Sequence, residues 1–444
     1  MNFNNKRDEL IYITIPSLCF VLLPLTLVTG PFLSDLSLSI ISIIFLVYCF
    51  KNKNFSFFKK KYFYFFLIFW IYLVLNSLFN NINLDSIKIS FFYFRFGVFF
   101  IAVYELIKLN NKIIDYFFNI TLVVFSILIV DGYYQYFSGS NIFGWPVSYS
   151  HRVSSLFGDE LILGSFISRL WPLFLAILVY FNSKKKLSNI AKKYFCLIIL
   201  ILSYILVFFS GERTAFFLIN LALIFILLFT NKNVLLKTIT VLLTVLTISS
   251  VTMFNDKAKK RLFDQTFSEM NITNQNEKIY IFSKNHTHHY ITAIKIFNDN
   301  KLFGVGVKNF RKFCKKENYI ISELGCSTHP HNNYIQLLAE TGLIGFSFIF
   351  LLFILFSFHI IKHIKNKFIK KEYFNDFQIC ILAGILITIW PIASTGNIFN
   401  NWLNIIYYLL ILLRLEKKYS IIQILSLLLQ ARIQPSDIQS IGEV

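Results

Sequence analysis

Long apolar runs recur along this chain of 444 residues and restrict it to one class of fold. A helix of about 20 apolar residues crosses a hydrocarbon core of roughly 30 Å, and we expect about twelve such spans. They are predicted at residues 11–29, 32–50, 62–79, 88–107, 114–136, 161–181, 194–210, 213–230, 234–254, 333–361, 377–394 and 398–415. Charged residues make up 15% of the chain, against about 25% in a typical soluble protein. The sequence therefore predicts an all-α integral membrane protein.

Lysine-rich and lysine-poor connections alternate between these spans. The lysine-rich set is 51–61, 108–112, 182–193, 231–233, 362–372 and 414–418, and the lysine-poor set lies near 30, 80–87, 137–160, 210–213 and 395–399. Because cytoplasmic loops are enriched in Lys and Arg, the alternation predicts that the basic loops and both termini are cytoplasmic. It also accounts for the net charge of +20, so we predict no binding to nucleic acid.

One long hydrophilic segment is then placed outside the membrane, directly before the third-last span. We divide the chain into membrane helices at 1–254, this outer loop at 255–332, the last three membrane helices at 333–418 and a cytoplasmic tail at 419–444. Turn signals such as Gly304-Val305-Gly306 predict short helices and turns within the loop rather than a large independent fold.

The stretch CSTHPHNNYIQLLAETGLIG closes the outer loop and runs into a long apolar helix. Pro330 suits the first turn of a helix, so His331 is expected at a helix N-terminus. The free N–H groups and dipole there attract anions and disfavour protonation of an imidazole, which makes His331 a candidate general base. The alternative is a histidine that only caps its helix. Four neighbouring polar residues are expected to support the site: His329, Asn332, Gln336 and Glu340.

Arginine is scarce beside lysine, yet several arginines fall on the expected outer side: Arg152, Arg213, Arg261 and Arg311. A guanidinium group binds phosphate in a bidentate geometry, so these residues are candidate phosphate ligands. For Arg213, in SGERTAFF, the alternatives are a snorkelling anchor and a pair with Glu212. Arg169 falls inside an expected span, with Glu160 as its candidate partner.

The outer loop also contains two cysteines, Cys314 and Cys326. In an oxidising compartment they could form a disulfide, which would restrain the segment ahead of His329. A zinc site built from the outer histidines is an alternative for this region. However, HTHH followed by HPH has no standard ligand spacing, so we predict neither a metal nor another cofactor.

Several stretches together resemble the O-antigen ligase and O-antigen polymerase superfamily of polytopic membrane glycosyltransferases. The resemblance is clearest from Tyr134 to Gly345. It is carried by YYQYFSGSNIFG, HRVSSLFGDELILGS, SGERTAFF, HYITAIKIFNDNKLFGVGVKNFR and HPHNNYIQLLAETGLIG. Family members have a His-Asn pair ahead of a helix that ends in Glu-x-Gly-x-x-Gly, and one large outer loop before the third-last span. The resemblance implies a GT-C-like fold in a bacterial inner membrane, with the active site facing the periplasm.

The resemblance also implies roles for individual residues. The donor is a glycan on polyprenyl pyrophosphate, His331 is the base, and Arg213 binds the pyrophosphate, with Arg152 as a further candidate ligand. Many relatives have an arginine where this chain reads NHTHHYITA. His286 or His288 takes that place, or Arg311 supplies the charge from elsewhere. Cations that neutralise the pyrophosphate make it a good leaving group, so we expect inverting, metal-independent glycan transfer.

Three functions are compatible with these features. The first is a ligase that moves a finished glycan onto a lipid A-core acceptor, and the second is a polymerase that extends glycans on the same carrier. The third is a transporter or flippase, which should carry polar groups at the bilayer midplane and repeated halves. This chain instead has its histidines and arginines gathered at the outer face of the membrane, which favours the two enzymes. Membrane lipids are expected to surround the protein.

Overall fold

The computed structural model describes residues 6–80, 83–110, 112–148, 151–184, 189–231, 264–272, 280–369 and 373–412, with isolated positions at 237, 238, 242, 249, 260 and 371. Apart from those single positions, the expected span at 234–254 lies outside the described residues. Arg261 and the expected tail at 419–444 also lie outside them.

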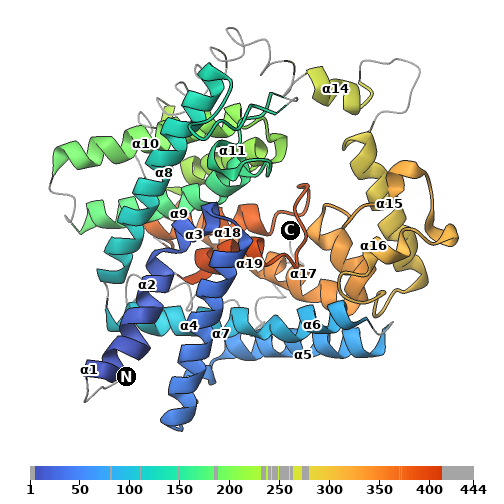
Figure 1. Ribbon diagram of the computed structural model, residues 1–444, viewed down its shortest axis with the longest axis horizontal. Coiled ribbons are helices and arrows are strands. Elements are labelled where there is room, and N and C mark those ends of the chain that lie inside the picture. The colour runs from blue at the N-terminus through green and yellow to red at the C-terminus, as the bar shows by residue number, and fades with distance from the viewer. Residues whose placement is uncertain are drawn as a thin grey trace.

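Helices make up most of the described chain, and no β-strand occurs in the described ranges (Figure 1). In chain order they are α1 (Lys6–Glu9), α2 (Ile15–Val21), α3 (Leu23–Val28), α4 (Pro31–Lys51), α5 (Lys61–Phe79), α6 (Leu84–Phe92), α7 (Phe94–Leu109), α8 (Lys112–Ser138), α9 (Leu163–Ser183), α10 (Ile190–Phe209), α11 (Arg213–Phe229), α14 (Gln265–Glu269), α15 (Lys284–Asp299), α16 (Phe310–Phe313), α17 (Asn333–Phe368), α18 (Asp376–Thr388) and α19 (Asn401–Leu412).

Seven helical stretches in the described residues are long and apolar enough to cross a membrane, with α6 and α7 counted together. Two more apolar helices, α11 and α18, are shorter. Each expected span other than 234–254 contains at least one of these helices or of the short helices α2, α3 and α19. The prediction of an all-α polytopic membrane protein is confirmed.

Helix α9 lies in the middle of the bundle, packed against α10, α11 and α18. In its apolar window 78% of the residues are buried, which is more than in the other long spans. Its middle part is apolar, and Phe174 stacks on Phe118 of α8 with ring centroids 4.8 Å apart. Because α9 is enclosed by protein, Arg169 near its start is surrounded by protein groups rather than lipid.

Helix α17 is interrupted at Gly342, although the sequence predicted one continuous span. Gly342 has φ 63° and ψ −168°, which breaks the helix into two segments. Its φ lies in the left-handed region that favours glycine, and a Cβ there would lie 2.2 Å from the carbonyl oxygen of Leu302. The break therefore depends on the absence of a side chain at this position.

The backbone groups freed by this break are hydrogen-bonded to residues 301–309, which we call the strap. The N–H groups of Val305 and Gly306 donate to the carbonyls of Ala339 and Glu340, at 3.0 and 2.8 Å. On the other side of the break, the N–H of Leu343 donates to the carbonyl of Lys301 at 2.8 Å. The strap thus replaces the intrahelical hydrogen bonds that a broken helix loses.

The ends of α5 and α6 hold the strap from its other side, next to α15 and α16 (Figure 1). Asn80 donates to the carbonyl of Phe303 at 3.2 Å, and Ser86 donates to the carbonyl of Val307 at 2.6 Å. A small apolar cluster joins α15, α16 and the strap to Ala339 of α17. The described part of the outer loop therefore has a small apolar cluster of its own, which packs on α17 through Ala339.

Candidate active site

The site is built where the long loop meets α17. The helix begins at Asn333, and the Asn332 side chain caps it by accepting from the N–H groups of Tyr334 and Ile335, at 3.0 and 3.1 Å. His331 is therefore not in the first turn, as Pro330 suggested, but just before the cap. It has φ 61°, a left-handed conformation that is uncommon for a residue with a side chain.

The connection between α18 and α19 wraps around this helix start. The Asn332 amide donates to the carbonyl of Pro391 at 2.7 Å, and the N–H of Thr395 donates to the carbonyl of His331 at 2.8 Å. Gln336 accepts from the N–H of Ile398 at 3.1 Å. The polar stripe that the sequence predicted on α17 thus holds the 391–398 segment against His331.

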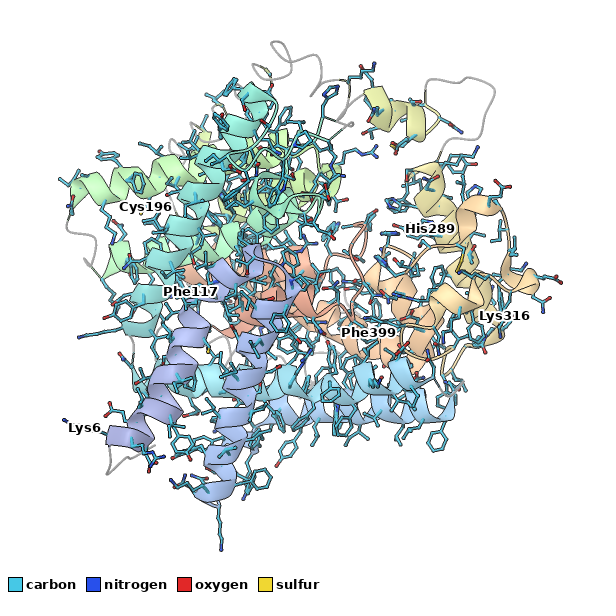
Figure 2. All side chains as sticks on the ribbon, in the orientation of Figure 1. Lys6, Phe117, Cys196, His289, Lys316 and Phe399 are labelled. Atoms are coloured by element: carbon cyan, nitrogen blue, oxygen red, sulfur yellow. A yellow bond between two sulfur atoms is a disulfide. The ribbon has the colours of Figure 1, made fainter. Side chains whose placement is uncertain are left out.

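Four histidine rings cluster at this point. The ring centroid of His331 lies 4.0 Å from that of His329, 5.2 Å from that of His286 and 5.4 Å from that of His289. His286 and His289 are one helical turn apart on α15, so both face the same side. Figure 2 marks His289 on α15.

His288, an alternative to His286 in the sequence, is placed differently. It faces away from the shared side of α15 and hydrogen-bonds Ser322 through Nδ1. His286 hydrogen-bonds Ser394 of the 391–398 segment at 3.2 Å. The structure therefore brings His286, and not His288, to His331, together with His289, which the sequence had offered only as a zinc ligand.

Burial is the main reason that these histidines resist protonation. It lowers the pKa of His331 to about 3, helped by the neighbouring His329, His286 and His289. Burial likewise lowers the pKa of His329 and of His289 to about 4. A neutral imidazole can accept a proton, and an anion bound nearby would stabilise the imidazolium that results.

Arg213 begins α11 and contacts α14 of the long loop. Its guanidinium donates to Glu269 at 2.7 Å and to Thr266 at 3.2 Å. Burial, and to a smaller extent the charge of Arg213, lower the pKa of His286, and the charge of Glu269 opposes this shift. The alternative partner Glu212 is engaged elsewhere, since it accepts from the N–H of Gly164 at the start of α9 at 2.6 Å.

Arg152, a candidate phosphate ligand, hydrogen-bonds two backbone carbonyls. Its Nε donates to the carbonyl of Ser210 at 3.3 Å, and its Nη2 donates to the carbonyl of Leu161 at 2.8 Å. These bonds fix the start of α9 next to the α10–α11 turn. We therefore assign Arg152 a positioning role.

A cavity of about 700 Å³ lies beside His329, and we call it the basic pocket. Arg169, Lys308 and Arg311 line it, together with Glu160, and the charge of Arg311 contributes to the low pKa of His329. The structure thus brings Arg311 to the site and adds Lys308 and Arg169. No local sequence signal distinguishes Lys308 from the many other lysines, because the strap that positions it is visible only in the fold.

Glu340 holds the backbone next to two residues that line the basic pocket, Lys308 and Arg311. It is fully buried, accepts from the N–H of Lys308 at 3.0 Å and from the N–H of Phe310 at 3.2 Å, and accepts from Gln336 at 2.9 Å. Lys308 has φ 57°, and the bond from its N–H to Glu340 holds this left-handed turn. Glu340 therefore positions Lys308 and the turn that leads to Arg311.

Cys314 and Cys326 are joined by a disulfide, with their Cα atoms 5.1 Å apart. The bond links α16 to the segment that leads to Thr328 and His329. His329 Nε2 faces the carbonyl of Thr395 at 3.3 Å, so this nitrogen carries the proton, and Nδ1 pairs with the Thr328 hydroxyl at 2.9 Å. In the described residues no group of three or more His, Cys, Asp or Glu side chains could hold a metal ion.

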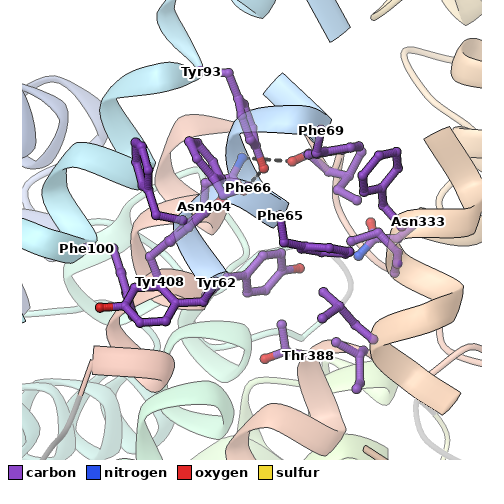
Figure 3. Close-up of a pocket in the computed structure, with 18 residues that line it drawn as sticks. Tyr62, Phe65, Phe66, Phe69, Tyr93, Phe100, Asn333, Thr388, Asn404 and Tyr408 are labelled. Carbon is purple, nitrogen blue, oxygen red and sulfur yellow. Dashed lines mark hydrogen bonds between the residues drawn. The ribbon is translucent and has the colours of Figure 1, made fainter. Parts of the chain in front are cut away.

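A second cavity, about 190 Å³ in volume, lies between α5, α7, α17, α18 and α19 (Figure 3). We call it the aromatic pocket, because rings such as those of Tyr62, Phe69 and Tyr408 form most of its wall. Asn333 lies at its edge, two residues after His331, and accepts from the Thr395 hydroxyl at 2.9 Å. The aromatic pocket therefore borders the segment that carries His331.

Comparison with known families adds to this geometry. Residues 197–350 match the family described as O-Antigen ligase. The match runs from α10 into α17 and includes Arg213, the histidine cluster, the strap and Glu340. No curated protein matches the chain. This region of the chain is therefore similar to the O-antigen ligase family, within a protein that has several helices long and apolar enough to cross a membrane.

Proposed function

We propose that this protein transfers a glycan from polyprenyl pyrophosphate to a lipid A-core acceptor at the periplasmic face of a bacterial inner membrane. One observation carries the proposal. A neutral His331 clusters with His286 and His329, whose pKa values the charges of Arg213 and Arg311 help to lower, and Arg311 lines the same cavity as His329. A base flanked by cations suits a reaction that removes a proton from a hydroxyl and releases an anion.

In the proposed step, His331 accepts the proton of the acceptor hydroxyl. The hydroxyl oxygen forms a bond to the anomeric carbon of the donor glycan, opposite the leaving group. The bond from that carbon to the pyrophosphate oxygen breaks, and polyprenyl pyrophosphate leaves with the electron pair. Attack from the opposite side inverts the anomeric configuration.

Arg213 and Arg311 supply positive charge where the leaving pyrophosphate becomes more negative. The partner of Arg213 is Glu269 on the short helix α14, and the arginine side chain is partly exposed. An exposed ion pair of this kind contributes only about 0–1 kcal/mol, so a pyrophosphate can compete for the guanidinium. The arginines therefore provide a charge clamp without a metal ion in the proposed step.

The aromatic pocket suits the lipid part of the donor. It lies among membrane helices, its wall is mostly apolar, and Asn333 connects it to the site (Figure 3). An isoprenoid chain is apolar and narrow enough to enter between helices, so the proposal places the start of the carrier chain there and its pyrophosphate near the histidines.

The test is glycan transfer in a bacterial strain that lacks its own ligase. Wild type should restore long lipopolysaccharide, whereas His331→Ala at equal protein level should leave the glycan on its carrier. His288→Ala is the matched control, because His288 lies on the same helix as His286 but outside the cluster. Wild type that only lengthens carrier-linked glycans would instead be a polymerase. Equal transfer by His331→Ala and wild type would reject the proposed base.

A further inference from the structure

The basic pocket holds more positive than negative charge. Arg169, Lys308 and Arg311 contribute cations, whereas Glu160, which is exposed, is the one carboxylate in its described lining. Burial and the charge of Arg311 lower the pKa of Lys308, so the two cations are close enough to repel each other. A bound anion would remove this repulsion.

Two buried donors in the lining point to the same conclusion. Arg169 is 3% exposed; its Nη1 donates to the carbonyl of Ser165 at 3.2 Å, while its Nε has no hydrogen-bond partner. Glu212 lies near enough that the charge of Arg169 opposes the rise in the pKa of Glu212 that burial causes. However, that carboxylate is hydrogen-bonded to the start of α9, which leaves the Arg169 Nε unpaired.

Asn397 provides the second unpaired donor. Its side-chain oxygen accepts from Gln336 at 3.0 Å and from the N–H of Phe399 at 2.8 Å, so the amide orientation is fixed. Its Nδ2 is buried and has no partner. Buried donors are normally satisfied, so these two mark side chains of the lining that can bind acceptor oxygens once they shift to expose the donor.

The rest of the lining suits a sugar better than a free ion. Trp145, Phe157 and Trp402 present ring surfaces, and the Trp402 indole is fixed by a 2.9 Å bond from its Nε1 to the carbonyl of Leu27. The cavity volume of about 700 Å³ falls within the 300–1,000 Å³ typical of small-molecule sites and exceeds what one phosphate needs. Aromatic faces, amides and cations together match a sugar ring that carries a phosphate.

We propose that the basic pocket binds a sugar phosphate group of a glycan substrate, with Arg169, Lys308 and Asn397 as its ligands. The inference rests on the proposed function, which brings such a substrate next to His329. The group has two possible sources: the donor sugar attached to its pyrophosphate, or a phosphorylated acceptor saccharide. Both present the same chemistry to the pocket.

Binding is measured with the purified full chain in lipid nanodiscs, with glucose 1-phosphate as the probe and glucose as the uncharged comparison. Tryptophan fluorescence is a direct readout, because Trp145 and Trp402 line the pocket. Loss of one charge-assisted bond should weaken binding of glucose 1-phosphate by about tenfold or more. We expect this loss for Lys308→Gln and for Arg169→Gln.

Lys301→Gln is the matched control, since Lys301 is an exposed lysine of the same strap and is not in the pocket lining. Arg169→Gln alters a buried charge, so its thermal midpoint is compared with that of wild type. Lys308 is only partly buried, and its variant keeps the backbone N–H bonded to Glu340. Unchanged binding by a folded Lys308→Gln, or equal binding of glucose and glucose 1-phosphate to wild type, overturns the inference.

A transfer assay then separates the two sources and the two proposals. An increase in KM for the donor alone in Lys308→Gln assigns the pocket to the donor, and an increase for the acceptor alone assigns it to the acceptor. If wild type binds glucose 1-phosphate through Lys308 but transfers no glycan, the proposed function fails and the pocket assignment stands. If glycan transfer requires His331 but Lys308→Gln binds glucose 1-phosphate as well as wild type does, the pocket assignment fails and the proposed function stands.

Discussion

The backbone N–H of Thr395 donates to the carbonyl oxygen of His331 at 2.8 Å, which joins the loop between α18 and α19 to the candidate base. The two residues are far apart in sequence, and neither one's position follows from its own helix. His331 has φ 61°. The bond from Thr395 holds that conformation, so the direction of the imidazole depends on a segment near the end of the chain.

Asn332 is expected to stabilise this junction by two separate means. Asn332→Ala removes the helix cap, worth about 1 kcal/mol, and also the bonds to Pro391 and Ala393. Asn332→Asp keeps an acceptor for the N–H groups of Tyr334 and Ile335 but loses the amide donor. In detergent, the thermal midpoint should be highest for wild type, lower for Asn332→Asp and lowest for Asn332→Ala. An Asp variant as unstable as Ala would mean that the cap contributes nothing.

The pH dependence of the reaction should reflect the low pKa of His331. The base must be neutral in the free enzyme, and its pKa is lowered from an ordinary value near 6.5 to about 3. The acid limb of kcat/KM should therefore lie well below pH 6.5. An acid limb centred near pH 6.5 in the wild-type protein would contradict burial of the base.

The same histidines should make the fold less stable in acid. His289, His329 and His331 all have folded-state pKa values below that of an exposed histidine, so the unfolded chain binds more protons. Stability is then greatest above about pH 6.5 and is lost as the pH falls toward 4. The thermal midpoint measured between pH 7.5 and 5 should fall less in His289→Gln than in wild type. A fall of equal size in both proteins would contradict this account.

Gly342 should be intolerant of a side chain. Gly342→Ala combines a left-handed φ of 63° with a Cβ 2.2 Å from the carbonyl oxygen of Leu302, so the strap must move. Gly139→Ala is a matched control, because Gly139 also has a positive φ of 87° but nothing lies within 4 Å of its Cβ. Gly139→Ala should lower the free energy of unfolding by about 1 kcal/mol because of backbone strain, and Gly342→Ala should lower it by several times more. Gly342→Ala should also remove most transfer activity. Equal costs would show that the contact with Leu302 is unimportant.

The disulfide should restrain the segment between Cys326 and His329. In intact, unreduced cells a thiol reagent that does not cross the membrane should leave Cys314 and Cys326 unlabelled, and reduction should expose both. Cys314→Ser with Cys326→Ser should lower the free energy of unfolding by about 2–4 kcal/mol. Labelling of both thiols without reduction would contradict the bond, and Cys19→Ser provides a control for the loss of a cysteine elsewhere.

The helical membrane fold and the importance of the HPHNN stretch could be predicted from sequence, because hydrophobic length and a polar motif are local properties. The local signal failed at Pro330, where the helix begins three residues later because Asn332 is the better cap. It also failed for Lys308, whose role depends on a backbone bond to Glu340 from another element. Contacts between segments distant in the chain, such as Thr395 with His331, leave no mark in the sequence near either residue.

The break in α17 also determines how much of that helix belongs in lipid. A straight helix of its 36 residues would be about 54 Å long, well beyond a hydrocarbon core of roughly 30 Å. Non-helical backbone is tolerated next to lipid only where protein buries it, and at this break the strap supplies the hydrogen-bond partners that the helix lacks. We therefore expect the part of α17 after Gly342 to cross the bilayer, whereas the turns with Gln336 and Glu340 are enclosed by protein contacts.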